Sequence, residues 1–147
     1  MTIKEQILSH LKDAMRAKDK KTLDTLRQIS AAVKQVEVDE RTEIADDRMI
    51  VILDKMAKQR KESISQFEKA GRDDLVENEQ FELTVISRYL PEPLTETEIQ
   101  SLIENTISDT GAEKMSDMGQ VMAALKPKVQ GRADMSQISA MIKAKLG

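Results

Sequence analysis

The sequence offers few residues that could support catalysis. His10 is the only histidine and there is no cysteine, so neither a cysteine–histidine nucleophile pair nor a zinc site built from those residues can form. The two pairs of adjacent carboxylates, Asp46–Asp47 and Asp73–Asp74, each precede an apolar helical pattern, and acidic residues are favoured at helix N-termini. The five glycines form no phosphate-binding loop. We therefore expect no catalytic residue, no metal and no cofactor in this chain.

Binding chemistry is indicated by three basic residues near the C-terminus, Lys126, Lys128 and Arg132. Residues 118–147 carry five basic side chains and one acidic side chain, although the formal net charge of the chain is −3. Such charge asymmetry favours an anionic partner, and an arginine can bind a phosphate through two hydrogen bonds. We therefore take these three as candidate RNA-binding residues. The alternative is that the basic residues only complement the dipole at a helix C-terminus.

Two other groups of basic residues are interleaved with acids or flanked by them. Opposite charges at helical spacing are typical of solvated surface pairs, which is how we interpret both groups. Neither group has an aromatic neighbour on which a base could stack. The first comprises Lys12, Arg16, Lys18, Lys20 and Lys21, and the second comprises Lys55, Lys58, Arg60 and Lys61.

The candidate residues surround the end of one short amphipathic helix. Pro127 has no N–H to donate, so we expect this helix to bend or end near it, and Gly131 suits the turn that follows a helix. Asp134 is expected to cap the last helix, with Gln137 completing a box-like pair. The apolar stripe of the short helix consists of Met118, Val121, Met122, Leu125 and Val129.

The same residues carry a family resemblance. The run from Asp117 to Asp134 resembles the C-terminal signature of the GatB/YqeY family, and residues 66–75 and Tyr89–Leu90–Pro91 also match the YqeY pattern. The resemblance covers residues from about Ile7 to Leu146. The length matches a free-standing YqeY-like protein, which is similar to the tail of the B subunit of the glutamine-dependent aminoacyl-tRNA amidotransferase.

The resemblance implies a helical module that binds tRNA or associates with that amidotransferase, without an active site of its own. The implied partners are tRNA and a protein of aminoacyl-tRNA synthesis or translation. Two alternatives remain open. The chain could be an enzyme with amidotransferase-related activity, a carbon–nitrogen ligase using glutamine as amido donor. It could also be an interaction module that docks on a larger assembly through apolar grooves.

Composition and apolar spacing predict an all-α protein. Charged residues make up 33% of the chain and aromatic residues 2%, which favours long solvated helices with aliphatic cores. The absence of cysteine, of a signal peptide and of a membrane-length apolar run leads us to expect a soluble, cytoplasmic protein with no membrane partner.

Helix signals predict two helical units joined at Pro91–Glu92–Pro93. A Thr-x-x-Glu capping box begins the first helix at Thr2 and another begins the fifth at Thr95. A polar loop is expected over 39–45, and a fourth helix over 72–90. We predict a four-helix N-terminal unit at 1–90, a stiff joint at 91–94 and a three-helix, tail-like C-terminal unit at 95–147, because two prolines in three residues forbid a continuous helix.

Overall fold

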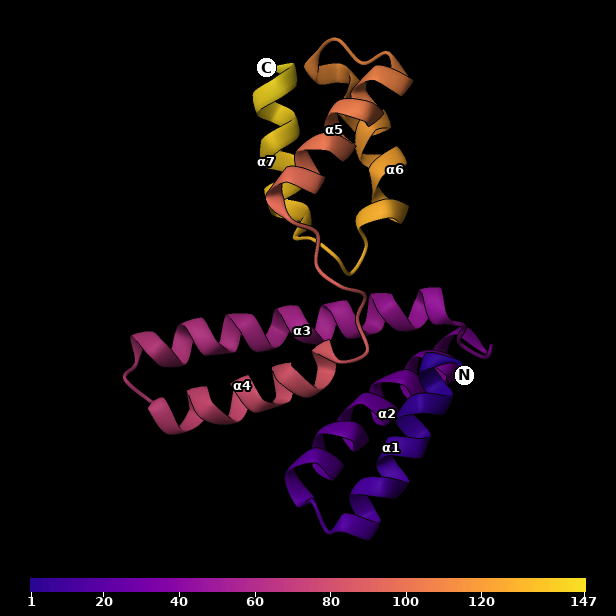
Figure 1. The fold of residues 1–147 in the computed structure, drawn as a ribbon, viewed down its shortest axis with the longest axis vertical. Coiled ribbons are helices and arrows are strands. Elements are labelled where there is room, and N and C mark those ends of the chain that lie inside the picture. Colours follow the sequence, from indigo (N-terminus) through magenta and orange to yellow (C-terminus); the bar gives the residue numbers. More distant parts are fainter. The chain divides into compact units, whose positions relative to one another are not determined.

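The computed structural model describes residues 1–147, and every regular element is helical (Figure 1). The predicted all-α class is confirmed. Seven α-helices and one short 3-10 helix follow in order: α1 Ile3–Ala17, α2 Lys20–Glu40, α3 Asp46–Lys69, α4 Asp73–Ser87, α5 Glu96–Thr110, η1 Met115–Asp117, α6 Met118–Val129 and α7 Met135–Leu146. None of them combines the length and apolar character that a membrane span requires.

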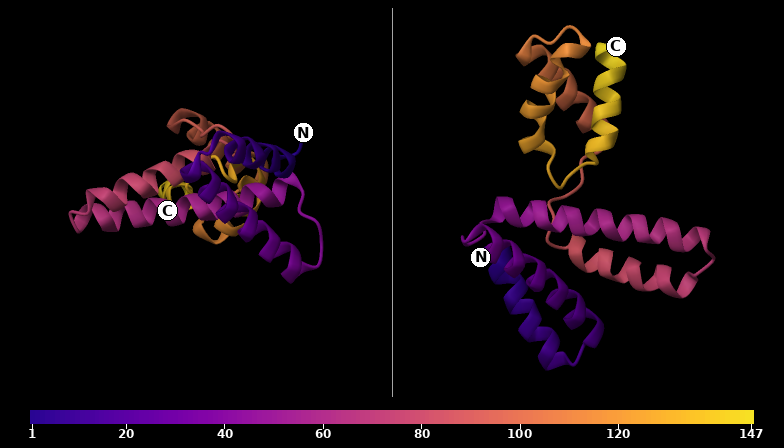
Figure 2. Two further views of the ribbon diagram at one scale, coloured as in Figure 1. Left: turned by 90° about the horizontal axis from the view of Figure 1, so that it is seen from below. Right: turned by 180° about the vertical axis from the view of Figure 1, so that it is seen from behind.

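The chain divides into two compact units, Met1–Leu90 and Pro91–Gly147. Each has its own cluster of buried apolar residues. In the first unit α1 and α2 form one helical hairpin, and α3 and α4 form a second (Figures 1 and 2). In the second unit α5 packs on α6 and α7.

Local capping signals begin several helices where the sequence predicts. The side chains of Thr2 and Thr95 each accept a hydrogen bond from the backbone N–H of the glutamate three residues on, and both capping boxes are complete. Asp19 caps α2 by accepting from Thr22 N. At the other end of α5, Gly111 has a φ of 69°, a left-handed conformation that glycine adopts without a steric penalty.

Long-range polar contacts join the start of α1 to the start of α3 and to the last turn of α2. Asp46 Oδ1, in the first turn of α3, accepts from Ile3 N at 2.9 Å, which satisfies a free N–H at the start of α1. Glu37 on α2 accepts from Lys4 Nζ at 2.7 Å and from Ile44 N at 3.2 Å. These hydrogen bonds lower the pKa of Glu37, chiefly through Lys4.

Two helix ends in the first unit differ from the prediction. The expected loop at 39–45 begins later, because α2 continues through Glu40; Gln35 donates to Asp39 one turn on, and Arg48 pairs with Glu40. α4 ends at Ser87 rather than Leu90. The helical conformation is unfavourable for a residue that precedes a proline. The helix therefore ends before Leu90, and a turn leads to Pro91.

Two details of the second unit concern helix ends. The helix expected to bend or end near Pro127 ends at Val129, two residues beyond it and at the last position of the predicted apolar stripe. Pro127 has no N–H to donate to the carbonyl of Ala123, but Ala123 is exposed and water can reach it. The turn after Pro127 brings Val129 into the core, where it is 1% exposed. Asp134 caps α7 as predicted, but it accepts from Ser136 N; no capping box with Gln137 forms.

The segment predicted as a joint, residues 91–94, is hydrogen-bonded within the second unit. Leu94 N donates to Arg132 O at 2.8 Å, and Arg132 Nε donates to Glu92 O at 2.9 Å. Whether residues 91–94 act as a stiff joint stays a prediction.

Candidate nucleic-acid interface

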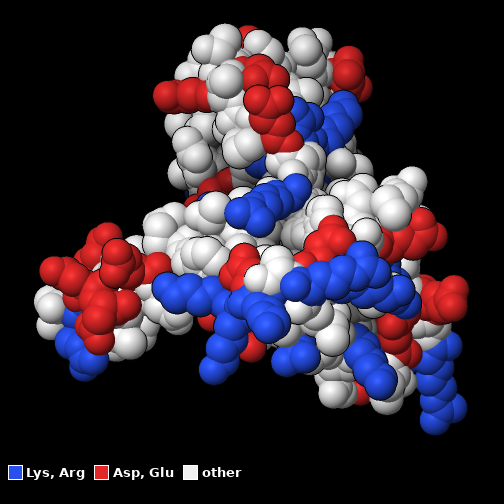
Figure 3. Space-filling model, turned by 60° about the horizontal axis from the view of Figure 1, so that its bottom comes forward, with Lys and Arg blue, Asp and Glu red and all other residues white.

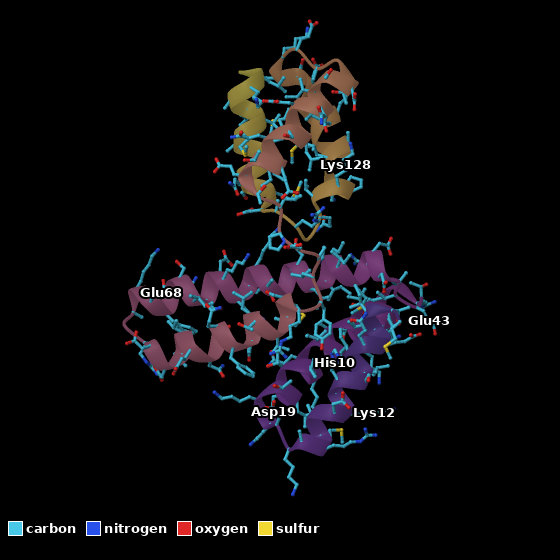
Figure 4. All side chains as sticks on the ribbon, in the orientation of Figure 1. His10, Lys12, Asp19, Glu43, Glu68 and Lys128 are labelled. Atoms are coloured by element: carbon cyan, nitrogen blue, oxygen red, sulfur yellow. The ribbon has the colours of Figure 1, made fainter.

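Lys126 and Lys128 lie in the last turn of α6, with their side chains exposed. Leu125 and Val129 are buried, and at 3.6 residues per turn Lys126 and Lys128 lie on the two flanks of this buried stripe, where both reach solvent. Neither lysine forms an ion pair or a side-chain hydrogen bond within the chain. Figure 4 labels Lys128 on α6.

Arg132 lies in the turn between α6 and α7 and is partly buried. Gly131 has a φ of 75°, which reverses the chain so that Arg132 N donates to Val129 O at 2.8 Å. Arg132 Nε then donates to Glu92 O at 2.9 Å. The side chain is held in one direction by this bond, and its two terminal nitrogens make no hydrogen bond within the chain.

The surrounding charges leave the three candidate residues without a carboxylate partner. Asp134, the nearest acidic residue in sequence, accepts from Ser136 N. Glu98 has a lowered pKa mainly because it is bonded to Thr95, and the charge of Arg132 adds a smaller effect. Of the other basic residues after Met118, Lys145 forms an ion pair with Glu104 at 3.1 Å. Below, the basic corner means Lys126, Lys128 and Arg132.

The first unit carries a second group of basic residues, most of which are unpaired although the sequence predicted surface pairs. We expected Lys12, Arg16, Lys18, Lys20 and Lys21 to pair with nearby acids, but only Arg16 does, at 3.8 Å from Asp13. Asp19 is occupied as a helix cap. The other four form no ion pair; Lys21 lies over the ring of Phe81, 5.5 Å from its centre.

On the face shown in Figure 3, acidic side chains gather at the end of the α3–α4 hairpin, and over the rest of the first unit basic side chains are numerous, with acidic ones among them. The second basic group, on α3, forms only some of the predicted pairs with acidic residues. Lys58 pairs with Asp54 at 3.4 Å, and Arg60 pairs with Glu82 at 2.9 Å. Lys55 and Lys61 are exposed.

The histidine and the paired carboxylates noted in the sequence contact neighbouring residues of the fold. His10 is exposed, and its Nδ1 lies 2.6 Å from the hydroxyl of the buried Tyr89, whose pKa is raised by burial. Asp46 bonds Ile3 N, and Asp74 pairs with Arg72 at 3.1 Å. No group of three or more histidine or acidic side chains could hold a metal ion.

The family of the chain follows from comparison with known proteins. The model of the Yqey-like protein family matches residues 4–146, which include both helical units and the basic corner. The chain belongs to the Yqey-like protein family. The resemblance noted on residues 66–75, Tyr89–Pro91 and 117–134 is thereby confirmed.

Relatives of this family member occur in fungi under the name "Altered inheritance of mitochondria protein 41, mitochondrial". The protein from Pyrenophora tritici-repentis is 32% identical over 145 residues, which cover 97% of this chain and 80% of that protein. The Saccharomyces cerevisiae protein is 32% identical over 129 residues, or 87% of this chain and 65% of that protein. The Eremothecium gossypii protein is 43% identical over 81 residues, 54% of this chain and 44% of that protein. The chain thus spans from about half to four-fifths of these relatives.

These names contradict the predicted cytoplasmic location, because all three relatives are named as mitochondrial proteins. The prediction rested on the absence of cysteine, of a signal-peptide pattern and of long apolar runs. Those features are compatible with any reducing, aqueous compartment, and they cannot distinguish one such compartment from another.

Proposed function

We propose that this member of the Yqey-like protein family is a non-catalytic helical module that binds tRNA through the basic corner. The observation that carries the proposal is the exposure of Lys126 and Lys128 without any ion pair. An unpaired surface lysine can neutralise a phosphate without first breaking a bond within the protein. The names of the fungal relatives favour a mitochondrial setting for such a module.

Arg132 supports the proposal through its geometry. Its Nε is bonded to Glu92 O, so the guanidinium is oriented before any ligand arrives and less rotamer freedom is lost on binding. The terminal nitrogens remain for a phosphate, which a guanidinium can bind with two parallel hydrogen bonds. A lysine at this position would keep the charge but lose the planar fork.

The composition of the second unit favours recognition of backbone and shape over sequence. All three aromatic residues, Phe67, Phe81 and Tyr89, precede residue 91. Without an aromatic side chain beside the basic corner, exposed bases have no ring on which to stack. We therefore expect weak binding with little sequence preference.

The test is a salt titration of the binding of a full-length tRNA transcript to the chain, measured by fluorescence anisotropy. Each neutralised phosphate of a duplex contributes roughly 0.9 to the slope of log affinity against log salt, so three contacts give a slope of at most about 2.7. The triple variant Lys126→Gln/Lys128→Gln/Arg132→Gln should lose binding, and Arg132→Lys should weaken it partly. Far-UV circular dichroism should show unchanged helical content in both variants.

The matched control removes three charges from the first unit instead: Lys12→Gln/Arg16→Gln/Lys18→Gln. We expect this variant to bind tRNA nearly as well as the parent. If the corner variant binds like the parent across the titration, the basic corner is not the RNA site. Loss of binding only in the control variant would assign the site to the first unit. Incubation with glutamine and misacylated tRNA should yield no amidated product.

A further inference from the structure

An open apolar groove of about 260 Å³ lies in the first unit along the α1–α2 hairpin. Its floor is formed by buried residues of three helices, and two residues at its edges reach solvent: Leu8, 48% exposed, and Lys34. The floor consists of Ile7 on α1, Ile29 and Val33 on α2, and Met49 at the start of α3. The groove lies in a different unit from the basic corner.

The size and openness of the groove suit the side chains of a helix better than an enclosed small molecule. Pockets that bury a drug-sized ligand usually measure roughly 300–1,000 Å³ and surround it on most sides. A cavity of about 150 Å³ accommodates benzene, so this groove has room for one or two apolar side chains. Ser30 lines the groove on α2, where a small residue leaves the space that a larger one would fill.

The charge along the groove is positive. Lys4 lines one end, and its charge is neutralised by Glu37 at 2.7 Å. Lys34 forms no ion pair and is exposed. Lys12 follows Leu8 by one helical turn on α1, is exposed and has no carboxylate partner. Two unpaired lysines therefore flank the apolar edge on the two helices.

We propose that this groove binds an amphipathic helix of a partner protein, one that carries carboxylates beside its apolar stripe. Apolar side chains at helical spacing would enter the groove beside Leu8, and the carboxylates would meet Lys34 and Lys12. The ligand helix would lie along the α1–α2 hairpin as a third helix. A second copy of this chain is a poorer occupant, because Met15, the exposed apolar residue seven positions after Leu8 on α1, has Lys12 and Lys18 three residues to either side of it rather than carboxylates.

The experiment uses the full chain and two synthetic peptides of about 18 residues, long enough to form a helix. Both carry leucines at positions i, i+3, i+4 and i+7; the flanking positions hold glutamate in one peptide and lysine in the other. Amide chemical shifts of the isotope-labelled chain locate binding, and fluorescence anisotropy measures affinity. We expect the glutamate peptide to shift groove residues and to bind at least about tenfold more tightly than the lysine peptide, a difference that added salt reduces.

Two variants test the groove by different means. Leu8→Glu places a negative charge at its edge, and Ser30→Met fills it; each should weaken the glutamate peptide at least about tenfold. The matched control is Met115→Glu, which changes an apolar residue of similar exposure, 42%, in the other unit and should leave affinity unchanged. Thermal melts followed by circular dichroism verify that each variant is folded.

Several results would overturn the proposal. Binding of neither peptide, equal binding of the two, or chemical shifts confined to residues outside α1 and α2 would each exclude this ligand chemistry. Unchanged affinity in both folded groove variants would exclude the groove. If sedimentation shows that the parent dimerises and that Leu8→Glu abolishes the dimer, the occupant is a second copy of the chain. Because tRNA binding is expected to survive both groove variants, this result is independent of the proposed function.

Discussion

The basic residues near the C-terminus differ in whether their side chains bond to other groups of the protein or remain available to a ligand. Lys126 and Lys128 are exposed without a partner, whereas Arg132 donates one hydrogen bond to Glu92 O and retains its terminal nitrogens. Lys145, in the same basic C-terminal segment, is paired with Glu104. The sequence shows only that all four residues are positively charged. Their hydrogen-bond and ion-pair partners in the structure show which of them remain available to a ligand.

Glu79 is the residue whose charge fits the fold least well. Arg60 is shared among three side chains: its Nε lies 2.9 Å from Glu82 and 3.8 Å from Glu79, and a terminal nitrogen lies 2.6 Å from Gln28. Glu79 Oε2 is buried and accepts no hydrogen bond. Burial, followed by the neighbouring charge of Glu82, raises the pKa of Glu79 above its usual value of 4.5.

Replacing this carboxylate with an amide should therefore stabilise the protein near neutral pH. Since the folded-state pKa of Glu79 is raised, its favourable contribution is complete below pH 4.5 and is lost as pH rises through the folded pKa. We expect Glu79→Gln to raise the melting temperature at pH 7, with the gain shrinking as the pH approaches 4. Melts across this range should be compared with Glu77→Gln, an exposed change on the same helix. A lower melting temperature for Glu79→Gln at pH 7 would show that the ion pair with Arg60 outweighs the burial of the charge.

At the scale of elements, α6 is stabilised by burial that overrides a local stop signal. Pro127 removes one backbone hydrogen bond, yet the helix continues to Val129, and Gln130 N closes the final turn on Lys126 O at 3.0 Å. Val121, Leu125 and Val129 are all buried in the core of the second unit. Tertiary packing commonly decides helix ends in this way, because helical propensity is a weak influence beside the burial of an apolar face.

Leu125 is the central residue of that buried stripe and is 0% exposed. Truncation to alanine removes buried methyl groups and leaves a cavity, so Leu125→Ala should lower the free energy of unfolding by about 2–5 kcal/mol. Urea denaturation followed by far-UV circular dichroism measures this loss. Met115→Ala, at a partly exposed position of the same unit, should change the value by no more than about 0.5 kcal/mol. If Leu125→Ala also lowered the free energy of unfolding by no more than about 0.5 kcal/mol, the apolar stripe would not stabilise the second unit.

At the scale of the whole molecule, stability is divided between two separate cores. The first contains residues from Ile7 to Tyr89 and the second residues from Ile99 to Leu146. No buried residue of either cluster comes from the other unit. The proposed RNA site and the proposed helix-binding groove belong to different units, so one could be altered without damaging the fold that supports the other.

This division predicts where core mutations act. Leu125→Ala should reduce amide hydrogen-exchange protection in α5, α6 and α7 and leave α1 to α4 near their parent values. Leu53→Ala, at a fully buried position of the first core, should do the reverse, since stability is local to each cooperative unit. Exchange followed by NMR distinguishes the two patterns. Equal loss of protection throughout the chain in both variants would show that the units unfold as one.

The sequence by itself determined the features that depend on neighbours within a turn or two. The capping boxes at Thr2 and Thr95 and the place of Leu125 on an apolar stripe were all predicted. They are local because a cap joins residues three apart and an apolar stripe repeats every three or four residues. The family resemblance, carried by runs of adjacent residues, was also legible in the sequence and is confirmed.

Only the tertiary structure decided which distant groups meet. Arg132 reaches a carbonyl 40 positions away, and Lys4 is neutralised by Glu37 from 33 positions away; no periodic pattern specifies such partners. The groove is lined by residues of three helices that are far apart in the sequence, from Ile7 on α1 to Met49 on α3. Each of these outcomes depends on packing between segments far apart in the chain, and packing is decided by three-dimensional proximity rather than by the order of residues.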